Sequence, residues 1–444
     1  MTQRLAVLSA ALFLASACPA AAAGKMYNAQ SASLPNGMQI VVIPVHRTPA
    51  VTHMVWYRAG AGEEPEGVSG TAHYMEHLMF KGTPTMAPGA FSAAIQRMGG
   101  NDNAFTSWDY TAYFQTVPKE KLADVMAMEA GRMTDLTPKL PDILSERQVV
   151  IEERRQTTDG DPGAMLRERM NNVLFPNHPY GRPILGWMSE MQTLKWVDAL
   201  VFYKKWYAPN NAILVVSGDT TMAQVLPMAQ ATYGRIEPKT IPARTRTVSP
   251  HLEGEISVTF QREDVHQPQW MREIRVPSAR QDRNASILLE LLEDLLGGTT
   301  GRLYQKLVVT DKIAVEAGVS YNPNAIDDGT FLVYGVPAPG VSIEKLSAAL
   351  QAVLTDAGKK GFTDAEVKSA IARLQDDAIY ARDSLSGPAM SIGYQLATGV
   401  SLDDIETWPT RLESLTPKDA QDALNTYVLN KNGVSGILLP KEGK

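Results

Sequence analysis

Two histidines and a glutamate lie within five consecutive residues, as His73, Glu76 and His77. The stretch 71–80 contains strong helix formers and no glycine or proline, so we expect a helix there. Residues three and four positions apart share one face of a helix, which would bring the three side chains into the same space. Two imidazoles one turn apart can each place a nitrogen about 2.0–2.1 Å from one Zn²⁺, while the carboxylate between them reaches a coordinated water. The pattern therefore predicts a catalytic zinc site with Glu76 as the base.

This chemistry suits hydrolysis of a peptide bond. Zn²⁺ lowers the pKa of its water toward roughly 7 and polarises the substrate carbonyl, so a nucleophile becomes available at neutral pH. With 7 histidines in 444 residues, a chance H-x-x-E-H pattern is rare. A single histidine is more often structural. We therefore interpret the remaining histidines as structural or surface residues: His46, His53, His178, His251 and His266.

A catalytic zinc needs a third protein ligand and one open position. The segment 146–153, ERQVVIEE, is the best source of a carboxylate. Glu146 and Glu153 are seven positions apart, almost two helical turns, and so share a face, whereas Glu152 points elsewhere. By spacing alone, Glu153 as a ligand competes with a solvated ionic surface made by the charged run 152–155.

Composition places the chain among soluble globular proteins. Its 444 residues favour two large domains, and 44% hydrophobic with 20% charged residues allow a large core. The net charge of −6 argues against a nucleic-acid partner, which would require a basic surplus. No uninterrupted apolar run of about 18 residues follows the N-terminal segment, so we expect no membrane span.

The first residues, 1–23, have the pattern of a removable export signal, with an early Arg4, an apolar run and a small-residue end. We therefore expect an exported, periplasmic protein. Cys18 is the one cysteine of the sequence and lies in this segment, so the cleaved protein would contain no thiol. The residues 15–18, ASAC, leave lipid attachment at Cys18 as an alternative.

The order of predicted elements indicates two similar domains. We expect strands at 38–44 and 50–57, the helix 71–80, a helix at 88–98 and a strand-like stretch at 103–117. Helices at 119–135, 142–157 and 163–173 and a buried strand at 212–216 complete an N-terminal zinc-bearing domain, 24–237. The Pro- and Thr-containing stretch 238–252 is predicted as a linker, and 253–444 as a C-terminal domain.

The C-terminal domain is predicted to repeat the first. Strands at 256–260 and 271–276 precede a helix at 286–296, which matches the order around the zinc motif. Aligning 72–83 with 289–300 places Glu293 opposite Glu76, and Glu290 and Asp294 opposite His73 and His77. The second copy has therefore lost both histidines. A chance match of two amphipathic helices is the alternative for this one segment.

Several segments together resemble the inverzincins, the family of pitrilysin, insulin-degrading enzyme and the mitochondrial processing peptidase. These are HYMEH (73–77), ERQVVIEE (146–153), GGNDNAFTS (99–107), HPYGRP (178–183), YAPNNA (207–212) and GRLYQKL (301–307). The resemblance implies an α+β fold of two structurally similar domains, related by internal duplication, each a mainly antiparallel sheet packed with helices. Such a unit forms half of a clamshell that encloses peptides.

The resemblance also implies roles for individual residues. It favours Glu153 as the third zinc ligand and implies that Glu146, without binding the metal itself, is a carboxylate that orients the site. Asn103 and Ala104 would lie on an edge strand that pairs with the substrate backbone, which tolerates many sequences because main-chain hydrogen bonds carry the affinity. The alternative for Asn103 and Ala104 is an ordinary strand start. The implied activity is that of a zinc metalloendopeptidase.

One departure from the family pattern concerns two donors. Active relatives carry an Arg directly after the GRLYQKL segment and a Tyr seven residues on, which bind substrate; here these positions are Val308 and Val315. Valine cannot donate a hydrogen bond. We therefore expect a second, non-zinc subunit of similar fold to supply them in a heterodimer, with a homodimer as the alternative. A non-catalytic scaffold or peptide-binding subunit is the rival function.

Overall fold

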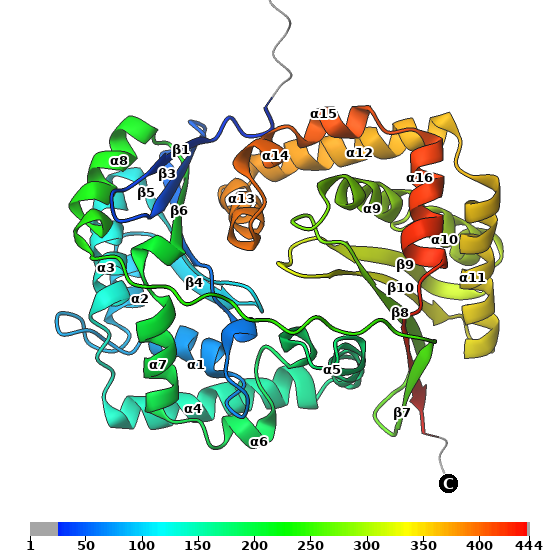
Figure 1. The fold of residues 1–444 in the computed structure, drawn as a ribbon, viewed down its shortest axis with the longest axis horizontal. Helices are drawn as coiled ribbons and strands as arrows, with labels where there is room; N and C mark the ends of the chain where they lie inside the picture. The colour runs from blue at the N-terminus through cyan, green and yellow to red at the C-terminus, as the bar shows by residue number, and fades with distance from the viewer. Residues whose placement is uncertain (1–24, 442–444) are drawn as a thin grey trace, which may run out of the picture.

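The computed structural model describes residues 25–441, which form two halves of mixed α and β structure (Figure 1). The predicted signal segment 1–23, including Cys18, lies outside the described residues. The first half contains a six-stranded sheet, β1 (Gln30–Ser33), β2 (Gln39–Pro44), β3 (Ala50–Tyr57), β4 (Asn101–Thr106), β5 (Thr111–Pro118) and β6 (Ala212–Gly218). The second contains a five-stranded sheet, β7 (Ile256–Arg262), β8 (Gln269–Val276), β9 (Ala314–Asn322), β10 (Gly329–Pro337) and β11 (Val434–Pro440).

The two sheets have the same topology. The first has the order β1-β2-β6-β3-β5-β4 and the second β7-β11-β8-β10-β9, so the two match strand for strand from β2 onward. In each sheet the last strand runs parallel to the first matched strand, β6 to β2 and β11 to β7, and the remaining pairs between matched strands are antiparallel. The predicted fold class, a duplicated α+β unit with mainly antiparallel sheets, is confirmed.

Helices pack against both sheets, most of them on the outer face. Those of the first half are α1 (Thr71–Leu78), α2 (Ala90–Arg97), α3 (Leu122–Thr134), α4 (Leu140–Arg154), α5 (Pro162–Leu174), α6 (Met188–Met191), α7 (Trp196–Trp206) and α8 (Met222–Ala231). Those of the second are α9 (Arg283–Leu296), α10 (Arg302–Tyr304), α11 (Ile343–Lys360), α12 (Asp364–Asp383), α13 (Gly387–Thr398), α14 (Leu402–Glu406), α15 (Trp408–Glu413) and α16 (Pro417–Ala423). None of the helices in the described range is long and apolar enough to cross a bilayer.

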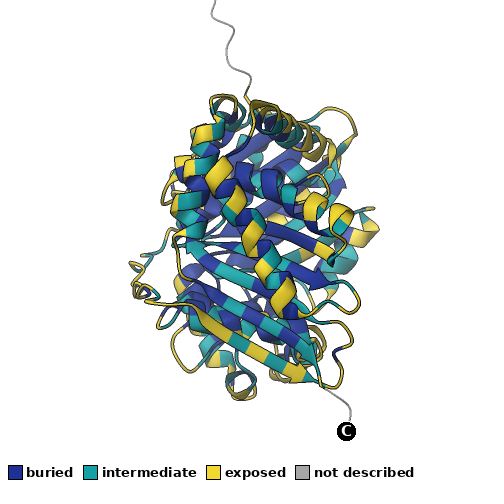
Figure 2. Cartoon of the chain, turned by 90° about the vertical axis from the view of Figure 1, so that its right-hand side faces the viewer, coloured by how far each residue is buried: buried dark blue, intermediate teal, exposed yellow. Residues whose placement is uncertain are grey.

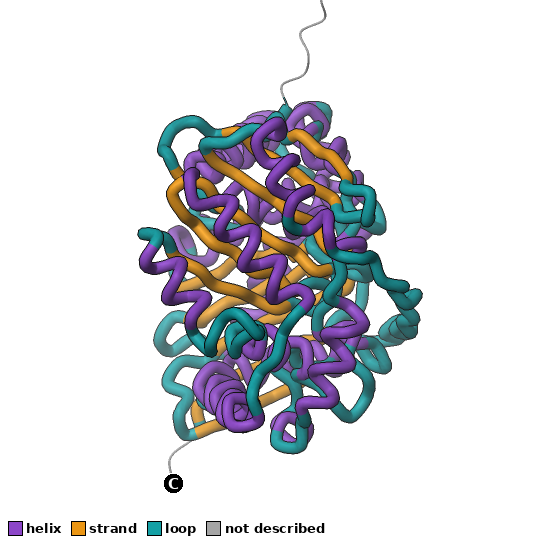
Figure 3. Tube along the Cα trace, turned by 90° about the vertical axis from the view of Figure 1, so that its left-hand side faces the viewer, coloured by secondary structure: helices purple, strands orange, loops and turns teal. Residues whose placement is uncertain are grey.

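Strand alternation gives each sheet two buried faces. In β3, Val51 and Val55 face the core under the outer helices, while Met54 and Trp56 face the opposite side. Figure 3 shows the helices crossing the strands on the outside of the first half. Figure 2 shows the second half from outside, with exposed residues on the outer helices, buried and half-buried strands behind them, and a largely exposed edge strand, β7, below. A sheet covered on both faces is a rigid frame for the loops and helices attached to it.

The second face of each sheet is covered by a helix from the other half. Leu166 and Met170 of α5 pack with Val434 of β11, and Ile392 of α13 packs with Trp56 of β3. In Figure 1, α13 accordingly lies beside the first sheet and α5 beneath the second. This exchange of helices makes the two halves share their cores.

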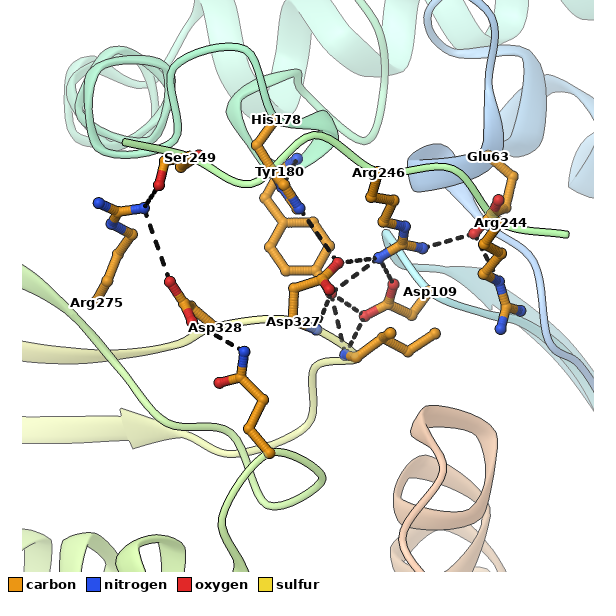
Figure 4. A network of polar contacts seen from close by, with 12 residues as sticks. Glu63, Asp109, His178, Tyr180, Arg244, Arg246, Ser249, Arg275, Asp327 and Asp328 are labelled. Carbon is orange, nitrogen blue, oxygen red and sulfur yellow. Dashed lines mark hydrogen bonds and ion pairs between the residues drawn. The ribbon is translucent and has the colours of Figure 1, made fainter. Parts of the chain in front are cut away.

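A buried charge cluster also joins the halves, around Arg246 in the extended segment between them (Figure 4). Arg246 forms ion pairs with Glu63 and Asp109 of the first half, at 2.6 Å each, and with Asp327 of the second half at 2.8 Å. The hydroxyl of Tyr180 donates to Asp109. One guanidinium thus compensates carboxylates from both halves, which are costly to bury unpaired.

The sequence-based prediction was wrong at one stretch and incomplete at others. The stretch 103–117, predicted as one strand-like run, is a hairpin in which β4 and β5 are joined at 107–110. The Ser107 N–H donates to the Tyr110 carbonyl across this turn, which lacks the Gly and Pro residues that mark most turns. Both strands show the same alternation, so the pattern alone did not reveal the turn. Strand β1, helices α6, α7 and α8, and all elements after α9 were not predicted.

Alanine substitutions at two helical glycines should change the stability of the protein in opposite directions. Gly393→Ala tests the packing of α13 against the first sheet, and Gly131→Ala is its control. A Cβ on Gly393 of α13 would lie 2.0 Å from the indole of Trp56, so Gly393→Ala should destabilise the protein by about 1–3 kcal/mol through overpacking. A Cβ on Gly131 of α3 meets nothing within 4 Å, so Gly131→Ala should stabilise it by about 0.5–1 kcal/mol through helix propensity. Thermal unfolding of both variants measures this. A Gly393→Ala protein as stable as the wild type would contradict the packing described here.

Candidate metal centre

The helix α1 carries His73, Glu76 and His77 and is fixed at its start by buried groups. Gly70, at φ +88°, precedes the helix, and a Cβ there would lie 2.4 Å from the Leu185 carbonyl oxygen. The carboxylate of Glu64 accepts the N–H groups of Gly70 and Ala72 at 3.0 and 2.7 Å. These bonds satisfy N–H groups that a helix start leaves unpaired. These contacts therefore hold the first turn of α1 in a fixed position relative to the sheet.

Helix α4 crosses α1 and brings the predicted carboxylates to it. The Tyr74 hydroxyl donates to the Ile143 carbonyl at 2.6 Å, and Val150 and Ile151 pack in the same core as Tyr74. Helix α1 also packs against α7 and against the sheet, so nearly all of its residues are buried. As a result, residues about 70 positions apart in the sequence meet at one helix crossing.

Three side chains predicted as zinc ligands lie together at this crossing. The Oε2 atom of Glu153 is 3.6 Å from His73 Nε2 and 3.3 Å from His77 Nε2, and one ligand atom from each residue lies within 4.8 Å of the others. Two atoms bound to one tetrahedral ion at about 2.05 Å are about 3.3 Å apart. The two measured separations are close to this value, so this donor set fits a zinc ion. Within residues 25–441 it is the one such group of His, Cys, Asp and Glu.

Glu146 fixes the orientation of one imidazole. The Nδ1 atom of His77 is 2.9 Å from Glu146 Oε1, and Lys81 forms an ion pair with the same carboxylate. Burial raises the pKa of Glu146, but the hydrogen bonds from His77 and Lys81 outweigh it and hold the pKa below its usual range. An ionised Glu146 accepts the Nδ1–H of His77, which leaves Nε2 as the nitrogen that faces Glu153.

His77 itself is held in an acidic surrounding. Burial lowers its pKa, but the hydrogen bonds to Glu146 and Glu153 outweigh this and raise the pKa to about 9. Burial also lowers the pKa of His73, to about 4. The two carboxylates therefore favour a positive charge on His77, whereas burial disfavours one on His73.

Glu76 lies next to this group without being part of it. Its side chain is buried, and the hydroxyl of Thr106 on β4 donates to Glu76 Oε2 at 2.6 Å. Burial raises the pKa of Glu76 to about 7, against the opposing effect of the Thr106 hydrogen bond. A carboxylate with a pKa near neutrality is suited to accept and return a proton at physiological pH.

Asn103 and Ala104 lie on β4, which is the edge strand of the first sheet. Their partners on β5 are Phe114 and Tyr113. The Ala104 N–H is bonded to the side-chain oxygen of Asn103 at 2.9 Å, and Asn103 is exposed. The other edge of β4 has no strand beside it in the described residues. This edge is open to pairing with an extended peptide.

The second half repeats the helix crossing with different chemistry. Arg373 lies on α12, which packs against α9 as α4 packs against α1. Arg373 pairs with Asp294 of α9, the residue aligned with His77, at 3.1 Å from Nε to Oδ1. An arginine–aspartate pair therefore occupies the place that His77 and Glu153 take in the first half.

The two valines in place of the family donors are partly or largely exposed. Val315 lies on β9 and is 46% exposed, and Val308 lies in the short helical segment Gln305–Thr310 that precedes this strand. The remaining histidines that we interpreted as structural include His53, buried between Gln115 and Tyr233 at 2.7 and 2.9 Å.

Sequence reasoning missed four residues of this site: Glu64, Tyr74, Lys81 and Thr106. Tyr74 lies inside the H-x-x-E-H motif, but on the face directed at the core. Thr106 is 30 positions from Glu76, and Glu64 lies in the irregular segment before α1. No spacing rule connects either residue to the helix. Lys81 alone had a usable signal, since it lies four positions after His77, one helical turn further on.

Comparisons with known proteins agree with this architecture. The family model described as "Insulinase (Peptidase family M16)" matches residues 40–187, and "Peptidase M16 inactive domain" matches residues 198–374. The zinc protease PqqE of Helicobacter pylori is 31% identical over 370 residues, 82% of each chain. The crystal structure of a protease from the same organism has a TM-score of 0.87 at 29% identity and covers 93% of this chain and 99% of that one.

A further solved structure, that of the periplasmic protease PqqL from Escherichia coli, has a TM-score of 0.78 at 19% identity. It covers 93% of this chain but 47% of the PqqL chain, so PqqL is about twice as long. The resemblance inferred from the motifs is thus confirmed by sequence and by fold. The chain belongs to the M16 or insulinase family of peptidases.

Proposed function

We propose that the chain is the zinc-bearing subunit of an endopeptidase that hydrolyses peptides or unfolded polypeptides. The single observation that carries this is the convergence of His73, His77 and Glu153, with donor atoms spaced for one tetrahedral ion. The names of relatives as zinc proteases support the same metal. Bound zinc would supply Lewis acidity, which polarises the scissile carbonyl and makes water acidic.

The residues of this chain would divide the remaining work. Glu76 would take the proton from the attacking water and return it to the leaving amine, a role for which its pKa of about 7 is suited. Glu146 would keep His77 in the tautomer that presents Nε2. The open edge of β4 at Asn103 and Ala104 would bind the substrate backbone as an added strand.

We further propose that a partner subunit of similar fold faces this one across a chamber. Val308 and Val315 cannot donate hydrogen bonds, and a second copy of the same chain would present the same two valines. This favours a partner of different sequence over a homodimer. The PqqL chain, about twice as long as this one, offers a precedent for two such units working together, and its description as periplasmic supports the same location here.

Replacement of Glu76 by Gln should separate catalysis from metal binding. The variant removes the base but no ligand, so kcat should fall by about 10²–10⁴-fold while zinc content stays at the wild-type level. Peptide hydrolysis and metal analysis of the same samples measure both quantities. A structural metal or a scaffold function predicts no change in either, and wild-type turnover by Glu76→Gln would refute the proposed mechanism.

Glu146 and Glu152 on α4 form a matched pair of variants. Glu146→Gln removes the charge that orients His77, so the affinity for zinc should fall by about 10- to 100-fold. Glu152 is exposed at the same helix and contacts neither histidine, so Glu152→Gln should bind zinc as the wild type does. Competition with a chromophoric chelator measures both affinities. Equal affinities for the two variants would contradict the role of Glu146.

The partner requirement has a direct test. The purified chain should bind zinc but cleave peptides slowly, since it lacks the two donors, and activity should appear when proteins that co-purify with it are added back. Peptide turnover with and without the added fraction measures the difference. Full turnover by the purified chain alone would exclude the need for a partner.

A further inference from the structure

Thr106 is the one hydrogen-bond partner of the Glu76 carboxylate within residues 25–441. The donor is a neutral hydroxyl, so it can bond to one carboxylate oxygen and leave the other free to accept a proton. A glutamate side chain without such a bond can turn about several torsions. The Thr106 bond therefore selects the position of Glu76 among these rotamers.

Thr106 is also part of the proposed substrate strand. Alternation along β4 places Ala104 and Thr106 on the side of α1, and Ala104 packs against the core beneath that helix. Phe105 lies on the other face, where its ring is 5.3 Å from Trp56 and 5.6 Å from Tyr394. The backbone that would pair with a peptide and the hydroxyl that holds Glu76 thus belong to one short segment.

The segment is rigid because all six residues of β4 pair with β5, from Asn101 opposite Thr116 to Thr106 opposite Thr111. Phe105 anchors the face of β4 turned away from α1 in the aromatic cluster that includes Tyr394 of α13. A shift of this strand would therefore move both the peptide-binding edge and the carboxylate of Glu76. A fixed distance between them is what a general base needs, since small misplacements of reacting groups cost large factors in rate.

We propose that Thr106 is a positioning residue that couples the peptide-binding strand to the catalytic base. The proposal rests on the function proposed above. It assigns to Thr106 no contact with the metal or with the substrate, but the task of holding Glu76 in register with a peptide bound along β4. Removal of the hydroxyl should then affect kcat rather than KM or the metal.

Three substitutions at Thr106 test this in the assembly that shows peptidase activity. Thr106→Val keeps the shape and removes the donor, so kcat should fall by about 10- to 100-fold, with KM and zinc content unchanged. Thr106→Ser keeps the donor and should retain most of the wild-type kcat. Thr106→Ala also removes the donor, and its side chain is smaller than that of valine. It is used in place of Thr106→Val if the valine variant does not fold. Wild-type kcat in the folded Val or Ala variant would overturn the proposal.

A crystal structure of each zinc-loaded variant provides a readout that does not depend on turnover. The carboxylate of Glu76 should leave its wild-type position in Thr106→Val and keep it in Thr106→Ser. An equal loss of kcat in the Ser and Val variants, or a loss of zinc with the kcat, would show that the contact is structural and overturn the proposal. The wild-type protein is the separate control on function: if its active assembly cannot be found, the peptidase assignment fails irrespective of Thr106.

Discussion

The crossing of α1 and α4 is the contact on which the candidate site depends. His73 and His77 come from one helix and Glu153 from another, and their donor atoms reach a common point only because the helices are held at one distance. The bond from Tyr74 to Ile143 and the packing of Val150 fix that distance from the core side. Coordination distances tolerate errors of about 0.2 Å, so the core beneath the crossing is part of the site.

The sequence predicted those features that follow from local periodicity. His73, Glu76 and His77 were placed correctly on one helix face because residues three and four apart must share it. Glu153 needed the family resemblance, since spacing alone did not distinguish a ligand from a surface charge. Thr106 could not be found, because its contact with Glu76 depends on how β4 lies against α1 and not on any repeat in the sequence.

The fold was predicted at the level of its duplication but not of its helix exchange. The apolar face of α5 shows that the helix packs against something, but its sequence does not state that the partner is the sheet of the other half. The same holds for α13 over β3, where Gly393 allows the close approach to Trp56. Such contacts depend on the arrangement of the whole chain. Together with the Arg246 cluster they explain why an unpaired edge on β4 can coexist with a well-fixed helix crossing.

The pair of Arg373 and Asp294 bears on the order in which the molecule can assemble. At the helix crossing of the second half the positive charge is covalently part of the chain, whereas the zinc ion proposed for the first half would have to come from solution. A newly folded molecule in zinc-poor surroundings would therefore already have one of its two crossings complete. Binding of the ion would then change the structure only locally, at the crossing of α1 and α4. The supply of zinc would determine the activity of the protein but not its fold.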